Sequence, residues 1–436
     1  MGKIAGDMIL DRRAGRVALP GRTRPGQAAP QYGRHDRYWI PLNHPHAVRF
    51  YTEHLFVPHS RQELLRGAVA RAMPAASPRM LPIRNGPETT LSATAAASPE
   101  LMALIERSLP RTRRASGDAL WPLILGPYQR SGRGQSILLL FEGASVRPVA
   151  LAKVAHAADQ RAQLQQEHDA LTTLQARLDP LMRSTVPAPL ALIRTETLTV
   201  LLETVLPGRS MYRDLRNSWQ PQALAARHLR LAQEWLVRFQ RSTLASDGPA
   251  DEALIREQVI APLERHAPRS TRERQMIEQA IETAHRLRGE RLPLVAQQGD
   301  FWPRNLLVHG GRVGVVDWER FHPCCAPFAD LLMFATSYGL SYPWRWGRWA
   351  DPVAAFRATY LSRSWLARCV RELVHSHCRR MQVTPAWLDV FFPVFLAQQV
   401  SQAQPAALDD EHTSGRQLWT QLIGEYAHQG GSACFG

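Results

Sequence analysis

The most regular pattern in the chain is a set of three short apolar runs in its middle part. They cover residues 120–125, 136–141 and 148–154, and a turn-rich loop separates the first two. Short apolar runs bounded by turn residues are typical of β-strands. Residues 157–178 then change to helical spacing, because leucines recur on one face at positions 164, 171, 174 and 178. The pattern predicts three strands followed by one helix.

Two more strands are predicted at 189–194 and 198–205, before Pro207 and Gly208 end the apolar run. From residue 208 onward the pattern is mainly helical, interrupted by one hairpin near 305–317. We therefore predict an α+β fold with two lobes. A small antiparallel sheet with one helix forms the first lobe, and a larger, mainly helical lobe follows.

Four segments follow from these changes in pattern. Residues 1–37 are basic, rich in Gly and Pro, and lack periodicity, which predicts a flexible tail. Residues 38–118 are predicted to be an N-terminal extension with short helices, and a Pro-, Ala-, Ser- and Thr-rich linker covers 74–98. The first lobe is assigned to 119–207 and the mainly helical lobe to 208–436.

The composition is that of an ordinary globular protein. Of the 436 residues, 45% are hydrophobic and 21% are charged, which excludes a wholly disordered chain, a collagen and a long coiled coil. No apolar run approaches the roughly 18–20 residues needed to cross a bilayer. No secretory leader is evident, so a cytoplasmic location is expected. Five cysteines in such a chain predict free thiols and no disulfide framework.

The formal charge of +15 indicates attraction to anions but does not select a partner. Nucleic acid, an anionic membrane surface and anionic metabolites all remain open, and the basic tail is the natural place for such binding. The identity of the basic residues is more informative. Of the 53 Lys and Arg residues, only Lys3 and Lys153 are lysines. Lys153 is therefore the one lysine outside the N-terminal tail, and every other basic Lys or Arg position there is an arginine.

Residues 298–319, which we call the acidic segment, carry the clearest chemistry in the sequence. Two apolar strands flank Gly310-Gly311, a pair that favours a tight hairpin turn. The hairpin brings its ends together, so Asn305 and Asp317 are expected to lie close to each other, with Asp300 on the preceding loop. Two converging carboxylates repel unless a cation accompanies them, and oxygen ligands of this kind suit Mg²⁺.

The acidic segment resembles the catalytic segment of the aminoglycoside phosphotransferase and choline kinase families, which are protein-kinase-like. Asp300, four intervening residues, Asn305 and then Asp317 match the kinase order of Asp, Asn and a later metal-binding Asp. The resemblance implies that Asp300 is the catalytic base for the acceptor hydroxyl. It implies that Asn305 and Asp317 hold Mg²⁺ on the phosphates of ATP. The family pattern usually begins His-Gly-Asp, and here Gln298 replaces the His.

Lys153 lies at the end of the third predicted strand, where kinases place their phosphate-binding lysine. Glu167 lies on the apolar face of the following helix, and a buried acid there needs a partner. The sequence therefore predicts a Lys153–Glu167 ion pair.

Other assignments follow from position alone. The loop with Gly132 and Gly134 is expected to cover the phosphates through backbone N–H groups. Glu203 and Val205 lie where the hinge of a kinase runs, so their backbone is expected to contact adenine. Asp330 is expected to cap a helix and to brace the catalytic loop.

The resemblance thus implies a Mg²⁺- and ATP-dependent phosphotransferase with a small hydroxylated acceptor, such as a sugar, an aminoglycoside-like molecule or another metabolite. Two alternatives remain open. One is a pseudokinase that acts as an interaction module without transfer, and Gln298 is the feature that raises it. The other is a basic nucleic-acid or membrane-surface binder that uses residues 1–37. An aromatic-rich segment is expected to pack between helices, with a sugar- or cation-binding site as the alternative; it contains Tyr338, Tyr342, Trp344, Trp346 and Trp349.

Overall fold

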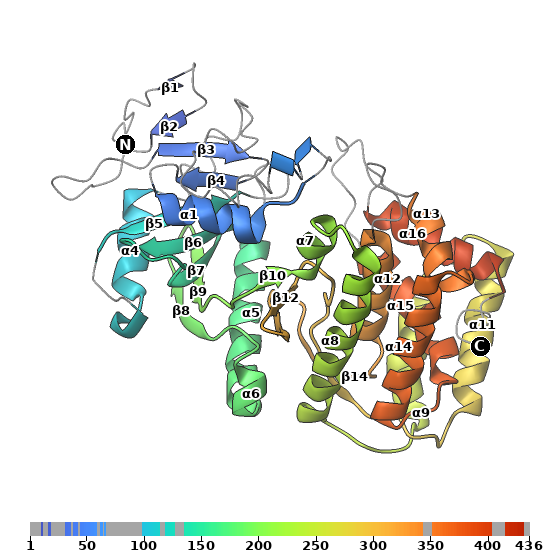
Figure 1. Cartoon of the computed structure of the whole chain (residues 1–436). Helices are drawn as coiled ribbons and strands as arrows, with labels where there is room; N and C mark the ends of the chain where they lie inside the picture. Colours follow the sequence, from blue (N-terminus) through green and yellow to red (C-terminus); the bar gives the residue numbers. More distant parts are fainter. Residues whose placement is uncertain are drawn as a thin grey trace. The chain divides into compact units, whose positions relative to one another are not determined.

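The computed structural model describes residues 10–11, 16–18, 31–35, 38–41, 44–58, 62–63, 65–66, 98–113, 118–126, 135–342, 351–402 and 415–430. The chain divides into two compact units, each of which is described by itself. Unit 1 contains residues 1–176 and 183–209. Unit 2 contains residues 177–182 and 210–436. Figure 1 labels the helices and strands of both units.

Unit 1 is built on an antiparallel sheet whose strand order is β1-β2-β3-β4-β5-β6-β7-β9-β8. The apolar runs of the sequence form its central strands, and helix α5 (Ala158–Arg177) follows β7 as predicted. The strands are β1 (Leu10–Asp11), β2 (Arg16–Ala18), β3 (Gln31–His35), β4 (Tyr38–Pro41), β5 (Leu120–Leu125), β6 (Ser136–Glu142), β7 (Ala150–Ala155), β8 (Pro189–Arg194) and β9 (Thr199–Glu203).

Strands β3 and β4 extend this sheet beyond the part that the sequence predicts. Strand β4 pairs with β5, so that Tyr38 lies opposite Leu125 and Trp39 opposite Ile124. Tyr32 of β3 is 1% exposed, and its hydroxyl donates to the Pro122 carbonyl at 3.2 Å. The structure thus differs from the predicted flexible tail at residues 31–35, because β3 pairs with β2 and β4 and its Tyr32 is buried against the sheet.

The residues before β5 also supply helices to the two faces of the sheet. Helix α1 (Pro45–Phe50) and the π-helical turn η1 (Tyr51–Leu55) bury Ala47 and Tyr51 in one core cluster with β5 and β6. Helix α4 (Pro99–Ser108) buries Leu101 and Ile105 in a second cluster, against other side chains of the same sheet. A 3₁₀ turn, η3 (Arg111–Arg113), follows α4. Residues 38–118, where described, therefore belong to the same compact unit as the sheet.

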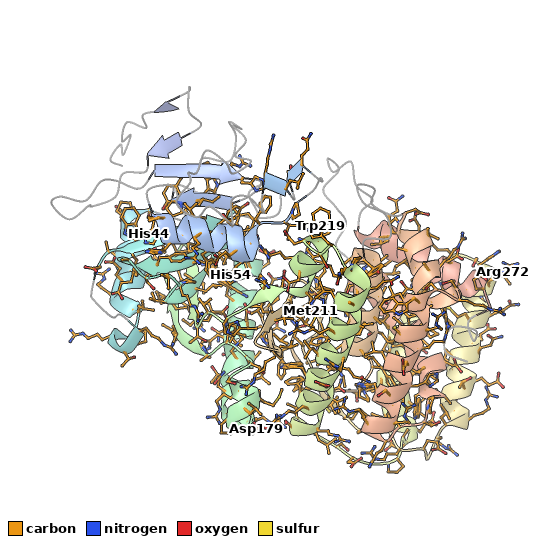
Figure 2. The ribbon with its side chains drawn as sticks, in the orientation of Figure 1. His44, His54, Asp179, Met211, Trp219 and Arg272 are labelled. Atoms are coloured by element: carbon orange, nitrogen blue, oxygen red, sulfur yellow. The ribbon has the colours of Figure 1, made fainter. Side chains whose placement is uncertain are left out.

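Two histidines fix the continuous helical segment α1–η1 to the rest of unit 1, and both are labelled in Figure 2. His44 caps α1, because its Nδ1 accepts from the Ala47 N–H at 3.0 Å. Its Nε2 therefore carries the proton and donates to the Gly143 carbonyl at 2.7 Å. His54 Nδ1 hydrogen-bonds the Gly208 carbonyl at 3.0 Å. The extension is thus tied to loops of unit 1 that lie about 100 and 150 residues away in sequence.

Unit 2 is mainly helical, as predicted. Its helices are α6 (Pro180–Arg183, at the junction of the units), α7 (Met211–Arg216), α8 (Pro221–Ser242), α9 (Glu252–Ile255), η4 (Arg256–Ile260), α10 (Ala261–Glu264), α11 (Thr271–Arg286), α12 (Ala329–Ser341), α13 (Pro352–Phe356), η5 (Arg357–Leu361), α14 (Trp365–Met381), α15 (Trp387–Gln402) and α16 (Gly415–His428). Within the described residues, no helix is long and apolar enough to cross a membrane.

Short strands frame the acidic segment in unit 2. Strands β12 (Leu306–His309) and β13 (Arg312–Val315) form the predicted hairpin, and they continue a three-stranded sheet with β10 (Arg209–Ser210). The sequence analysis did not identify β11 (Val295–Gln297) and β14 (His322–Cys325), which pair across the segment. An aromatic core lies beneath. Phe301 stacks on Trp235, with ring centroids 5.4 Å apart, and Trp318 is fully buried.

Several predicted features lie outside the described residues: the linker at 74–98, the phosphate-covering glycines Gly132 and Gly134, and the tryptophans Trp344, Trp346 and Trp349. Tyr338 and Tyr342 are described and buried, and the Tyr338 hydroxyl hydrogen-bonds His228 at 3.1 Å. Tyr338 therefore packs inside unit 2.

A buried histidine in α14 predicts acid sensitivity. Burial lowers the pKa of His377 to about 4, and its Nε2 donates to the Pro327 carbonyl at 3.0 Å. Because the pKa of His377 in the folded protein lies below its unfolded value, the free energy of unfolding is highest above about pH 6.5. It falls as the pH is lowered towards 4, since protonation then favours the unfolded chain. We expect His377→Gln, which keeps a donor for Pro327, to reduce the loss between pH 7 and 4.5 by about 2 kcal/mol. Urea unfolding at both pH values measures it, and equal losses in both proteins would contradict this account.

Candidate active site

The β12–β13 hairpin closes through the predicted pair of glycines. Gly310 has a φ of 55° and Gly311 a φ of 78°, the left-handed values that a tight two-residue turn requires. The strands pair from His309 and Arg312 back to Leu306 and Val315. Beyond them, the Val316 N–H donates to the Asn305 carbonyl at 3.0 Å. This pairing continues the ladder to the open end of the hairpin, where Asn305 and Asp317 follow.

The loop that carries Asp300 is held in place by its neighbours. Gly299 has a φ of 86°, and a Cβ atom at this position would lie 2.1 Å from the Arg320 carbonyl oxygen, so only glycine fits. Asn305 Nδ2 donates to both the backbone oxygen and the Oδ2 of Asp300, each at 3.0 Å. Phe301 anchors the next position in the aromatic core. The Asp300 carboxylate is therefore held by Asn305, and its neighbours Gly299 and Phe301 fix the backbone on both sides.

The site is electrostatically prepared for a cation. Burial, and next to it the charge of Asp317, raises the pKa of Asp300 to about 6, against smaller opposing effects of Arg320 and Asn305. Asn305 uses its amide nitrogen on Asp300, and no donor reaches its Oδ1 among the described residues. That oxygen and the Asp317 carboxylate form an oxygen donor set of the kind that Mg²⁺ prefers. The donors thus fit a hard divalent cation.

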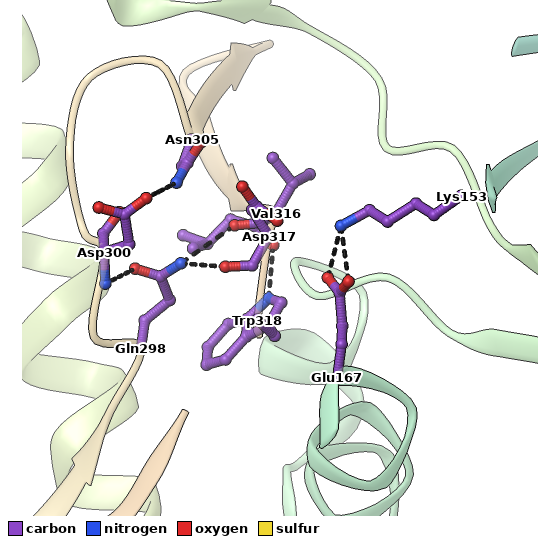
Figure 3. Close-up of polar contacts among 9 residues, drawn as sticks. Lys153, Glu167, Gln298, Asp300, Asn305, Val316, Asp317 and Trp318 are labelled. Carbon is purple, nitrogen blue, oxygen red and sulfur yellow. Dashed lines mark hydrogen bonds and ion pairs between the residues drawn. The ribbon is translucent and has the colours of Figure 1, made fainter. Parts of the chain in front are cut away.

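The structure brings Gln298 into the centre of this network (Figure 3). Its side-chain oxygen accepts from the Asp300 N–H at 2.8 Å. Its side-chain nitrogen donates to the Val316 carbonyl at 3.2 Å and to the Asp317 carbonyl. The sequence marks Gln298 only as a departure from the family pattern, and its position two residues before Asp300 was the available signal.

Asp330 braces the loop as predicted but does not cap α12. Its carboxylate accepts from the Gln298 N–H at 2.6 Å and from the Gly299 N–H at 2.9 Å. The residue that precedes the helix is Phe328, which makes no side-chain cap. The capping prediction is wrong because Asp330 already lies inside the helix, where its oxygens are committed to the loop. Burial raises the pKa of Asp330 to about 7, although the two hydrogen bonds oppose the shift.

The predicted Lys153–Glu167 pair is present in unit 1 (Figure 3). Lys153 Nζ lies 2.6 Å from Oε1 and 2.7 Å from Oε2 of Glu167. Lys153 is 4% exposed and Glu167 is fully buried. Strand β7 and helix α5 supply the two residues. Pairing both carboxylate oxygens with one ammonium group satisfies a buried acid that would otherwise be costly.

The two residues predicted to form the hinge lie at the end of strand β9 and just after it. Glu203 is its last residue, lies opposite Leu151 of β7, and is 2% exposed. Thr204 then exchanges hydrogen bonds with Ala188, and Val205 packs against the α1–η1 core cluster. The backbone after β9 is thus held on both sides in unit 1.

Arg304, which flanks the acidic motif in the sequence, stacks on aromatic rings. The Arg304 guanidinium lies 4.2 Å from the ring centroid of Tyr212 and 5.2 Å from that of Trp302. Its buried Nε and the buried Nε1 of Trp302 have no hydrogen-bond partner in the described part of the chain. Arg304 lies immediately before Asn305 in the sequence. Stacking holds this cation in position while its hydrogen-bonding capacity stays unused.

Comparison with known proteins gives three kinds of result. No curated protein sequence matches the chain. Several solved structures resemble it at low identity. The aminoglycoside phosphotransferase APH(4)-Ia is 14% identical with a TM-score of 0.46, covering 78% of this chain and 99% of that one. The amicoumacin kinase hAmiN, solved with AMP-PNP, Ca²⁺ and Ami, is 13% identical with a TM-score of 0.43, covering 78% and 97%. The aminoglycoside phosphotransferase APH(3'')-Id from Streptomyces rimosus is 16% identical with a TM-score of 0.33, covering 63% and 90%.

The sequence pattern of one family covers the α5 helix, the acidic segment and most of the helices that follow. This pattern, that of the phosphotransferase enzyme family, matches residues 140–422, well over half of the chain. The predicted kinase-like fold class is thereby confirmed, and the chain belongs to the phosphotransferase enzyme family.

Proposed function

We propose that the protein transfers the γ-phosphate of ATP to a hydroxyl group of a small molecule, with Mg²⁺ as the cofactor. The observation that carries the proposal is the joint arrangement of Asp300, Asn305 and Asp317 at the open end of one hairpin. A buried carboxylate is positioned there beside two oxygen ligands. Phosphoryl transfer needs little covalent chemistry from the protein, so positioned charges of this kind supply most of the catalysis.

Each residue has a defined task in this proposal. Asp300 orients the acceptor hydroxyl and accepts its proton, while Asn305 Nδ2 holds the carboxylate still. Asn305 Oδ1 and Asp317 would hold Mg²⁺, which when bound offsets the charge on the phosphates. Lys153, fixed by Glu167, would bind the phosphates of the nucleotide. The backbone of Gly132, Gly134, Glu203 and Val205 is proposed to contact the phosphates and the adenine.

For the acceptor we favour a sugar or other hydroxylated metabolite over a polycation. Arg304 lies four residues after the candidate base, and no carboxylate pairs with it in the described ranges. A free guanidinium at this position repels the amines of an aminoglycoside and favours a neutral or anionic molecule. ADP release with hexoses that differ only in charge, namely glucose, glucosamine and glucuronate, compares these acceptor classes directly.

The experiment that tests the function is thermal and urea unfolding with ATP, in the presence and absence of Mg²⁺. A ligand at about 100 times its Kd adds roughly 2.7 kcal/mol to the free energy of unfolding. We expect a Mg²⁺-dependent gain of this size in the wild type. Asp317→Asn should lose the Mg²⁺-dependent part, because a neutral amide replaces a charged metal ligand.

The matched control is Asp159→Asn, which changes an exposed aspartate in the first turn of α5 and should keep the full gain. An Asp317→Asn protein that responds to Mg²⁺ and ATP like the wild type would remove Asp317 from the metal site. A wild type that gains no stability from any nucleotide would instead favour the pseudokinase alternative, in which the family fold serves binding alone.

A further inference from the structure

One side chain connects the loop of Asp300 to the strand end that carries Asp317. Gln298 is fully buried, and its side-chain amide makes three hydrogen bonds. Its oxygen accepts from the Asp300 N–H, and its nitrogen donates to the carbonyls of Val316 and Asp317. The amide orientation is fixed by these partners, because the reverse orientation would place its oxygen against two carbonyl oxygens and its NH₂ group against an N–H.

The bond to Asp317 falls at an unusual backbone position. Asp317 has a φ of 66°, and apart from Gln382 it is the one non-glycine residue with positive φ in the described ranges. L-residues adopt this left-handed conformation only at an energetic cost. Such conformations persist where the surroundings hold them, and they concentrate at functional sites. Gln298 supplies this restraint, since it binds the carbonyl group of the strained residue itself.

We propose that Gln298 is a positioning residue that sets Asp300 and Asp317 relative to each other. This inference rests on the proposed function for its catalytic consequence and on geometry alone for the restraint. A neutral imidazole offers one N–H and one lone pair, and a protonated imidazole offers two N–H groups and no acceptor. Neither form reproduces one accepted and two donated bonds. Gln298 thus joins the loop of Asp300 to the strand end of Asp317 by itself, and its presence in place of the usual family histidine is no sign of lost activity.

The neighbouring Gln297 provides a matched control. It is also buried, at 1% exposed, and it also makes one accepted and one donated bond. Its partners, however, are the Asp330 N–H at 2.9 Å and the Ala326 carbonyl at 3.1 Å, and its side chain makes no bond to Asp300 or Asp317 among the residues that the structure describes. Equal substitutions at 297 and 298 therefore disturb the same chemistry at different places, which separates general destabilisation from a positioning effect.

Hydrogen–deuterium exchange tests the restraint without any ligand. In Gln298→Leu we expect faster exchange in peptides that cover both 298–305 and 313–319, because the two ends of the connection are released together. In Gln297→Leu we expect the increase in the peptide that covers 326–332. Unchanged exchange in 313–319 in Gln298→Leu, beside an increase in 298–305, would overturn the proposal, since the residue would then hold only its own loop.

Steady-state kinetics tests the catalytic consequence. For Gln298→Leu we expect kcat to fall roughly tenfold while the KM for ATP changes little, because a positioning bond is lost and no nucleotide contact is removed. ATP consumption with the best acceptor, or with water, gives kcat. Gln297→Leu should lose less kcat. Equal losses of kcat in the two variants would show a structural role only and would overturn the proposal.

The two tests also separate this inference from the proposed function. If the wild type neither binds nor consumes ATP but Gln298→Leu loosens both peptides, the proposed function fails and the restraint stands. If the wild type is active and Gln298→Leu shows the same kcat and the same exchange pattern as the wild type, the proposed function stands and Gln298 has no positioning role.

Discussion

Replacing Asp300 with asparagine is expected to lower kcat for phosphate transfer by roughly 10²–10⁴-fold, the usual contribution of a general base. The asparagine keeps an oxygen for the Asn305 Nδ2 bond, so the loop geometry should be retained. Binding of ATP with Mg²⁺ should persist, because Asn305 and Asp317 are unchanged. Steady-state kinetics gives kcat, and unfolding with the nucleotide gives binding.

Two results would contradict this assignment of Asp300. An Asp300→Asn protein with undiminished kcat would mean that another group takes the proton. A protein that loses nucleotide binding together with kcat would mean that Asp300 acts mainly as a metal ligand. The comparison with Asp317→Asn separates these cases, because that variant should lose the Mg²⁺-dependent stabilisation first.

Lys153→Met is expected to destabilise unit 1 by about 3–5 kcal/mol, the cost of leaving a buried carboxylate without its partner. Glu167 is fully buried and depends on Lys153 Nζ for both oxygens. The double variant Lys153→Met/Glu167→Leu should recover most of this loss, because it removes both charges and keeps the volume. Urea unfolding of the two single variants and the double variant measures the coupling.

The control for this prediction is an exposed pair in the same unit. Arg49 Nε lies 2.7 Å from Glu53 Oε1, one turn along the chain, with 54% and 33% of the side chains exposed. Arg49→Met should change the stability by no more than about 0.5 kcal/mol. If the double variant at 153 and 167 recovers stability but not activity, the lysine is required for the reaction as well as for the fold. Recovery of both would remove it from the nucleotide site.

Local pattern was enough to predict the parts of the fold that form from neighbouring residues. The strand runs at 120–125 and 189–194 and the two-glycine turn were found because a short apolar run or a turn motif needs only a few consecutive positions. The Lys153–Glu167 pair was found because a buried acid on an apolar helix face implies a partner. These features need no long-range information.

Other parts depend on contacts that the pattern does not show. Strand β4 owes its place to β5, about 80 residues later, and helix α4 was assigned to an extension because its apolar face has no partner nearby in sequence. At the candidate site, Gln298 suggested a loss of activity, because the family pattern has a histidine at this position. Two of its three bonds depend on a strand end almost 20 residues away. Asp330 was misassigned as a cap for the same reason, since its partners are backbone groups of another loop.

The pairing of β4 with β5 also decides how far the protein can be shortened from its N-terminal side. A chain that begins at residue 119, where the family-like pattern starts, would leave the edge of β5 without its neighbour. It would also uncover both apolar faces of the sheet, because α1 and α4 would be missing from their clusters. Open, apolar edge strands pair with other copies and aggregate. The N-terminal extension thus covers surfaces that would otherwise self-associate. A recombinant protein that begins within this extension should be insoluble, even though all of its candidate catalytic residues are present.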